Sequence, residues 1–101
     1  MTDATSHRAQ IHELLKAFKK QHAKEYRLRA LGYFGSCARN EATVESDVDI
    51  VFQTDEPNLF RTAAMKQDLE DLLRRPVDLV RLREAMNPRL KARIERDAIY
   101  V

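Results

Sequence analysis

The chain has 101 residues, of which 44% are hydrophobic and 34% are charged, with a formal net charge of +2 at pH 7. This composition is too apolar for a disordered segment and too charged for a membrane protein. The longest apolar runs, such as residues 50–52, fall far short of the roughly 20 residues that cross a bilayer. We therefore expect one folded domain over residues 1–101 and no membrane-spanning helix.

The cysteine content and the N-terminus both favour the cytoplasm. Cys37 is the only cysteine, so the chain can form neither an internal disulfide nor a cysteine-based zinc site. Residues 1–16 lack the basic segment, the apolar run and the cleavage site of an export signal. We expect a cytoplasmic protein whose fold depends on packing alone.

The first half of the chain predicts a helix, a strand and a short second helix. Apolar residues recur at helical spacing from residue 6 to about residue 24. Residues 27–34 then become apolar, as in a strand that enters a core. Gly35 follows at the end of this strand, where glycine suits a bend or a close approach of the backbone to a ligand. Residues 36–39 can form a short helix.

The second half continues the alternation of strands and helices. After a polar turn at 40–46, the expected elements are a strand at 48–52, a helix from the cap Asn58 to Arg75, a strand at 77–82, a helix from the cap Asn87 and Pro88, and a short terminal strand at 98–101. Pro76 ends the middle helix. The order α-β-α-β-α-β-α predicts an α/β (α+β) fold in which helices flank a small mixed sheet.

Two aspartates accompany the strand at 48–52. Residues two apart on a strand point to the same face, so Asp47 and Asp49 should project together while Val48 and Ile50 point away. Two like charges at the end of a core strand need a cation, a proton or a basic partner. Asp78 lies in an apolar strand and, buried or half-buried, needs a partner for the same reason. If the two strands are neighbours, three carboxylates meet.

Three carboxylates can hold one or two Mg²⁺ ions that clamp phosphate oxygens, as phosphoryl and nucleotidyl transfer require. The aspartates alone favour a plainer interpretation, in which Asp47 is a turn residue, Asp49 an exposed edge acid and Asp78 the partner of an arginine. Gly35 and Ser36 change this balance, because a glycine and a hydroxyl at a strand-to-helix junction offer N–H and O–H donors to phosphate.

Residues 35–40 (Gly-Ser-Cys-Ala-Arg-Asn) and 46–51 (Ser-Asp-Val-Asp-Ile-Val), followed by Asp78 on a later strand, carry a family resemblance. This pattern resembles the signature of the minimal nucleotidyltransferases of the DNA polymerase beta superfamily. The family usually has glycine where this chain has Asn40, and asparagine tolerates a positive φ better than most residues. The resemblance implies a single nucleotidyltransferase domain over residues 1–101.

The resemblance also implies roles for individual residues. Gly35 and Ser36 would bind the β- and γ-phosphates of ATP, with Arg39 and Ser46 as further nucleotide-binding residues. The resemblance leaves open whether Arg39 supports the loop or the triphosphate. The metal ligands would be Asp47, Asp49 and Asp78. In that set Asp78 would complete the Mg²⁺ site or accept the proton of the attacking hydroxyl.

Small members of this family are commonly antitoxins that adenylylate a tyrosine of a HEPN ribonuclease toxin. The resemblance therefore implies AMP transfer from ATP to a protein hydroxyl, the role of a type VII antitoxin, and a hetero-oligomer with the toxin. Two alternatives stay open: an antitoxin that only binds and blocks its partner, and a transferase that acts on a small molecule. The arginine-rich last third fits a solvated face or an acidic partner better than a nucleic-acid groove, so we do not expect nucleic acid as a direct ligand.

Overall fold

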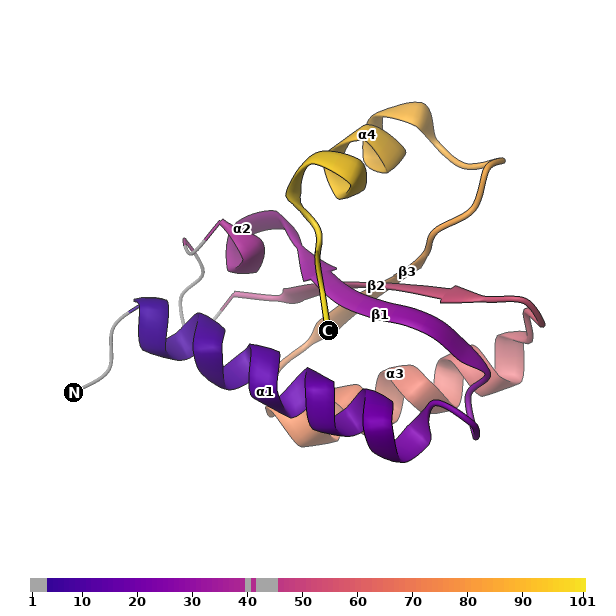
Figure 1. The fold of residues 1–101 in the computed structure, drawn as a ribbon, viewed down its shortest axis with the longest axis horizontal. Helices are drawn as coiled ribbons and strands as arrows, with labels where there is room; N and C mark the ends of the chain where they lie inside the picture. Colours follow the sequence, from indigo (N-terminus) through magenta and orange to yellow (C-terminus); the bar gives the residue numbers. More distant parts are fainter. Residues whose placement is uncertain (1–3, 40, 42–45) are drawn as a thin grey trace.

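Helices and strands alternate along the chain (Figure 1). The computed structural model describes residues 4–39, 41 and 46–101. Its elements are α1 (Ala4–His22), β1 (Leu28–Phe34), α2 (Gly35–Ala38), β2 (Val48–Thr54), α3 (Leu59–Leu73), β3 (Val77–Arg81), α4 (Pro88–Asp97) and β4 (Ile99–Tyr100). The predicted order and the α/β class are confirmed. Asn40 and most of the predicted turn at 40–46 lie outside the described residues.

Within the described residues, the strands form one four-stranded sheet in the order β3-β2-β1-β4. β1 runs antiparallel to both of its neighbours, β2 and β4. β2 and β3 run parallel. A tight turn cannot join parallel neighbours, so the chain crosses between them through α3. In this strand order, β3 forms one edge of the sheet.

The two faces of the sheet carry different helices. α1 and α3 cover one face and α4 lies on the other (Figure 1). Side chains of β2 alternate between these layers, as the pleat of a strand dictates. Val48, Ile50 and Phe52 join the larger apolar cluster under α1 and α3, whereas Val51 joins a smaller cluster with Phe34 and Ile94. The smaller cluster is the one that lies beside the candidate site.

Asparagine side chains cap the N-terminal ends of the helices that follow β2 and β3. The Asn58 side chain accepts a hydrogen bond from Arg61 N at 2.9 Å, and Asn87 caps α4 in the same way. The sequence predicts that the middle helix reaches Arg75, but α3 ends two residues earlier. Arg74 adopts a left-handed conformation with φ of 60°, and its N–H bonds to Glu70 O at 2.8 Å. This turn closes the helix before Pro76.

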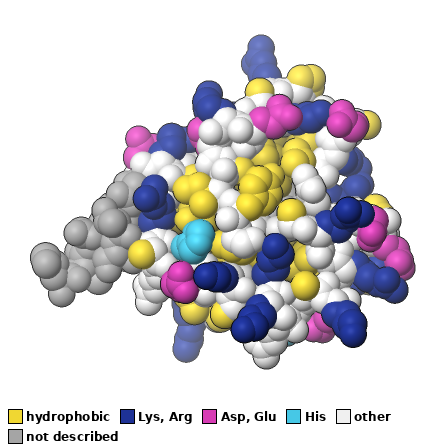
Figure 2. All heavy atoms as spheres, viewed as in Figure 1, with side chains coloured by type: hydrophobic (Ala, Val, Ile, Leu, Met, Phe, Trp, Pro, Cys, Tyr) yellow, Lys and Arg dark blue, Asp and Glu magenta, His cyan; other side chains and the backbone are white. Residues whose placement is uncertain are grey.

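Basic side chains do not gather in one place on the face that Figure 2 shows; Lys and Arg are spread among acidic and hydrophobic side chains. Of the helices in the described ranges, none is both long and apolar enough to span a membrane.

β4 approaches β1 very closely at a glycine. Gly32 pairs with Tyr100, and a Cβ at position 32 would lie 2.5 Å from Ile99 O. Only glycine avoids this backbone contact. Val101 N then donates to Leu31 O at 2.9 Å, and Lys19 Nζ donates to Val101 O at 3.0 Å. These bonds hold the end of the chain between β1 and α1.

We expect Gly32→Ala to lower the free energy of unfolding by about 1–3 kcal/mol, because β4 must move away from β1. Urea denaturation measures this difference. Arg29→Ala is the matched control, since that side chain on the same strand is exposed and its pair with Asp55 is long, at 3.4 Å. The control should change stability by less than about 0.5 kcal/mol. Equal stability of the two variants would contradict this account of β4.

Candidate active site

A glycine and a carboxylate meet where β1 ends. Phe34, the last residue of β1, pairs with Asp49 on β2. The next residue, Gly35, has a φ of +69°, a conformation that L side chains rarely adopt. A Cβ on Gly35 would also clash with Oδ2 of Asp49. The backbone at the start of α2 can therefore lie against this carboxylate only because residue 35 has no side chain.

Asp78 lies directly beside Asp49 in the sheet. The two are register partners on the parallel strands β2 and β3, so their side chains share one face. That face is the α4 side, where Val80 joins the smaller apolar cluster. The expectation that Asp78 is buried or half-buried was wrong. Asp78 is exposed on β3, which is an edge strand of the sheet.

Asp47 and Ser46 precede the strand. β2 begins at Val48, so Asp47 does not itself belong to β2, and its side chain is exposed. Ser46 is half-buried beside it. The charge of Asp47 nevertheless reaches Asp49, where it adds to that of Asp78. The structure thus brings the three predicted carboxylates to one region, with Asp49 at the centre.

The surroundings of Asp49 disfavour its charged form. Burial raises the pKa of this carboxyl above its ordinary value, and the negative charge of Asp78 raises it further. Arg93 and Arg39 act in the opposite direction and lower the pKa, whereas Asp47 raises it. A cation placed between the carboxylates would offset both their mutual repulsion and the cost of burying the charge of Asp49.

The donor set fits Mg²⁺, which prefers carboxylate oxygens. Within residues 4–39, 41 and 46–101, however, no three His, Cys, Asp or Glu side chains are arranged closely enough to hold a metal ion by themselves. Mg²⁺ is usually held by one or two carboxylates together with phosphate oxygens of the substrate. Asp49 and Asp78, beside the side-chain-free backbone at Gly35, can supply that share. The metal-binding role of Asp47, Asp49 and Asp78 stays a prediction.

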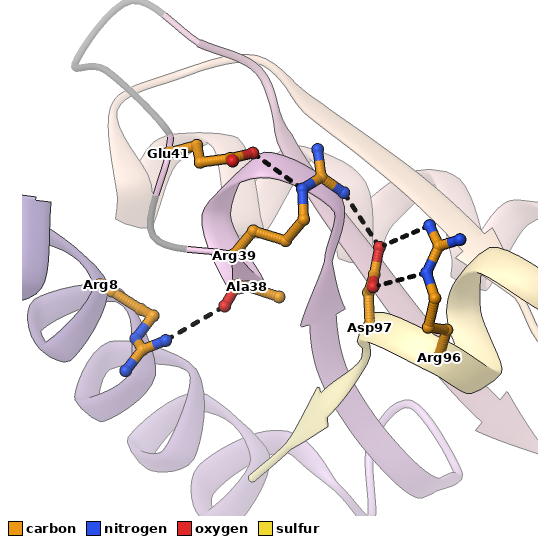
Figure 3. Close-up of polar contacts among 6 residues, drawn as sticks. All are labelled: Arg8, Ala38, Arg39, Glu41, Arg96 and Asp97. Atoms are coloured by element: carbon orange, nitrogen blue, oxygen red, sulfur yellow. Dashed lines mark hydrogen bonds and ion pairs between the residues drawn. The ribbon is translucent and has the colours of Figure 1, made fainter.

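Ser36 lies in α2, half-buried, immediately after Gly35. The N-cap residue Phe34 makes no side-chain hydrogen bond to the start of α2, and N–H groups at such a position can bind an anion. At the other end of α2, Arg8 of α1 donates to Ala38 O at 3.1 Å. This bond holds α2 in place from the N-terminal helix (Figure 3).

Arg39 connects α2 to α4 (Figure 3). Its Nε donates to Glu41 at 2.8 Å and its Nη1 to Asp97 at 2.9 Å. Asp97, at the end of α4, also accepts from Arg96 at 3.0 Å. The resemblance leaves Arg39 as either a loop support or a triphosphate ligand. These two ion pairs favour the first role, since they already occupy the guanidinium.

One residue beside the site was not singled out by the sequence analysis. Arg93 of α4 places its guanidinium carbon 5.8 Å from the centroid of the Phe34 ring, and its charge acts on Asp49. In the sequence Arg93 is one of many arginines in the last third. Only the packing of α4 on the sheet distinguishes it, so no sequence signal could have found it.

Cys37 follows Ser36 in α2. It is buried in the larger apolar cluster, and burial raises the pKa of its thiol. A neutral, buried thiol is inert, so Cys37 has a packing role rather than a chemical one.

The sequence pattern of the nucleotidyltransferase domain matches residues 11–101. This chain belongs to the nucleotidyltransferase domain family. The expected resemblance to minimal nucleotidyltransferases is thereby confirmed, and so is the fold that it implied.

Named relatives of this nucleotidyltransferase have nearly the same length. A candidate protein adenylyltransferase of Methanocaldococcus jannaschii is 38% identical over 94 residues, which cover 92% of this chain and 96% of that protein. The protein adenylyltransferase MntA of Thermococcus cleftensis is 34% identical over 93 residues, which cover 91% and 93%. These likenesses place the chain close to protein adenylyltransferases.

Solved structures share the fold. A candidate minimal nucleotidyltransferase matches with a TM-score of 0.70 and 31% identity, covering 97% of this nucleotidyltransferase and 95% of that chain. A toxin-antitoxin structure with AMP-PNP gives 0.72 at 19% identity and covers 88% and 70%. A chain of the complex between a tri-AMPylated Shewanella oneidensis HEPN toxin and its MNT antitoxin gives 0.64 at 18%, with the same coverage. The last two likenesses establish the fold alone.

We expect Gly35→Ala to destabilise this nucleotidyltransferase by about 1–2 kcal/mol through its positive φ, and further through the clash with Asp49. Combining it with Asp49→Ala separates the two causes, because the second change removes the clashing carboxylate. In that background Gly35→Ala should cost about 1 kcal/mol less. Urea denaturation of the four proteins in this cycle measures the coupling. Additive effects would show that the glycine and the carboxylate do not touch.

Asp49→Asn should stabilise the metal-free protein at neutral pH. The folded-state pKa of Asp49 lies above its ordinary value of 3.8. Between the ordinary pKa and the raised folded-state pKa, the unfolded chain has already lost this proton while the folded protein still holds it. The free energy of unfolding therefore falls as the pH rises from the first pKa to beyond the second. Asparagine removes this loss. We expect a gain of up to about 1 kcal/mol near pH 7 that disappears near pH 4.

Urea denaturation at both pH values, with a chelator present, measures the gain. Asp55→Asn is the matched control, an exposed aspartate just after the same strand. It should show no such pH-dependent gain. Equal behaviour of Asp49→Asn and Asp55→Asn would contradict the electrostatic account of Asp49.

Proposed function

We propose that this nucleotidyltransferase transfers AMP from ATP to a hydroxyl of a partner protein, with Mg²⁺ as its cofactor. The observation that carries the proposal is the placement of Asp49 beside both Asp78 and the side-chain-free backbone at Gly35. Metal-binding carboxylates next to a phosphate cradle are what nucleotidyl transfer needs. The likeness to named protein adenylyltransferases supports a protein as acceptor.

The site residues would have separate roles in binding the metal, binding the phosphates and accepting the proton. Asp47 and Asp49 would hold one or two Mg²⁺ ions together with oxygens of the triphosphate. Held there, Mg²⁺ would supply neutralisation of phosphate charge and a lower pKa for the attacking hydroxyl. Backbone N–H groups at Gly35 and the Ser36 hydroxyl would bind the β- and γ-phosphates, with Ser46 close to the nucleotide. Asp78, which is exposed, can serve as the third metal ligand or accept the proton of the incoming hydroxyl.

The transfer itself is an in-line displacement at the α-phosphorus. The acceptor oxygen forms a bond to phosphorus while the bond from phosphorus to the bridging oxygen of the β-phosphate breaks. Pyrophosphate leaves, and the acceptor proton passes to Asp78 or to solvent. Because ATP is the donor, we place this reaction in the cytoplasm.

For the acceptor, we propose a tyrosine of a HEPN-type ribonuclease toxin, which makes this chain the antitoxin of a type VII toxin-antitoxin system. The shared fold with the antitoxin that accompanies a tri-AMPylated HEPN toxin supports this choice. The enzyme and toxin would form a hetero-oligomer. Leu59 and Phe60, adjacent and 87% and 88% exposed, offer apolar surface for a protein contact. That nucleic acid is not a direct ligand stays a prediction.

Incubation with Mg²⁺ and ATP labelled at the α-phosphorus tests this function, with a HEPN-type toxin as acceptor. We expect covalent label on a tyrosine of that protein and a mass increase of one or more AMP units. Asp49→Asn should reduce labelling at least about 100-fold, whereas Asp55→Asn should leave it unchanged. Neutralisation of the toxin without label would indicate a non-catalytic antitoxin. Label on a small hydroxyl compound alone would indicate the other alternative.

A further inference from the structure

One arginine stands at the junction between the glycine and the carboxylates. The guanidinium of Arg93 lies over the ring of Phe34, with its carbon 5.8 Å from the ring centroid. Phe34 pairs with Asp49 across the sheet and is followed directly by Gly35. Arg93 is therefore adjacent to both halves of the candidate site.

The position of Arg93 is set by the packing of α4. The next residue, Ile94, is fully buried against Phe34 and Val51. Asn87 caps the start of the helix, and Asp97 at its end is tied to Arg39. The helix is thus fixed at its start, its middle and its end. Arg93 itself is exposed on this fixed support and can reach a ligand without a backbone rearrangement.

The guanidinium of Arg93 is available to a ligand. Asp49 and Asp78 are neighbours on the α4 side of the sheet, and Asp47 immediately precedes β2. The other nearby cation, Arg39, is already paired with Glu41 and Asp97. Among the described residues, none forms a hydrogen bond or ion pair with the Arg93 guanidinium. Its effect is felt only through space, where it lowers the pKa of Asp49.

We propose that Arg93 is a phosphate-binding residue of this site, which contacts the β- or γ-phosphate of bound ATP and the pyrophosphate as it leaves. This inference rests on the proposed function. A triphosphate brings several negative charges to a site that already holds three carboxylates, so a cation beyond the metal is needed. Arginine meets that need with a planar fork that matches two phosphate oxygens. The β- and γ-phosphates are favoured over the α-phosphate because Phe34, under Arg93, immediately precedes the Gly35–Ser36 cradle.

Titration calorimetry with Mg²⁺ and either ATP or AMP tests the inference on the wild-type chain and three variants. Arg93→Gln should weaken ATP binding about 10- to 100-fold and leave AMP binding unchanged. Arg93→Lys keeps the charge but not the fork, so we expect an intermediate loss for ATP. Arg89→Gln, one turn earlier on α4 and also exposed, is the matched control and should bind both nucleotides as the wild type does.

Equal loss of ATP and AMP binding in Arg93→Gln, or loss of neither, overturns the inference. Thermal unfolding of each variant shows whether the fold is intact, and Arg93→Lys gives a second reading if Arg93→Gln does not fold. The labelling experiment separates the two proposals. Normal ATP binding by Arg93→Gln beside an active wild type removes only the role of Arg93. A wild type that binds ATP through Arg93 but labels no acceptor removes only the proposed function.

Discussion

The parallel pairing of β2 with β3 is the constraint on which this molecule depends. It fixes Asp49 and Asp78 side by side on one face, and the antiparallel pairing with β1 brings Gly35 against the same carboxylate. Burial and like charge make ionised Asp49 unfavourable in the isolated chain. The ionised Asp49 therefore lowers the stability of the isolated chain, and a bound cation with a phosphate can restore that stability.

The two faces of the sheet have different tasks. The larger cluster, under α1 and α3, contains most of the fully buried side chains and supplies the bulk of the hydrophobic stabilisation. On the other face, α4 packs through the smaller cluster of Phe34, Val51 and Ile94. This packing places Arg93 over Phe34 and brings Asp97 to Arg39. Packing on this face therefore positions charges, and the opposite face keeps the domain folded.

Local signals in the sequence were enough to predict the elements and most of the candidate site. Hydrophobic periodicity, the caps Asn58 and Asn87 and the proline at 76 determine where the helices begin and end. The glycine at 35 and the spacing of Asp47 and Asp49 mark the candidate site, for which phosphate and metal binding stay proposals. These features act over a few residues, so a single sequence reveals them.

Features that depend on strand order or on distant contacts could not be predicted. Asp78 was expected to be at least half-buried, because an apolar strand is typical of a sheet interior; the sequence does not reveal that β3 is an edge strand. The Arg39–Asp97 pair joins residues 58 positions apart, and Arg93 gains its place only through α4. Each of these depends on tertiary packing, which periodicity and propensity do not encode.

A crystal structure of the chain with Mn²⁺ and a non-hydrolysable ATP analogue would show whether the carboxylates of the site bind a metal ion beside the triphosphate, since Mn²⁺ accepts the same oxygen ligands as Mg²⁺ and is visible by anomalous scattering. We expect an anomalous peak at the carboxylate of Asp49, with Asp47 or Asp78 as a further ligand, and the triphosphate against the backbone at Gly35. A peak elsewhere, or an Asp78 side chain turned away from Asp49 while the nucleotide is bound, would contradict the account.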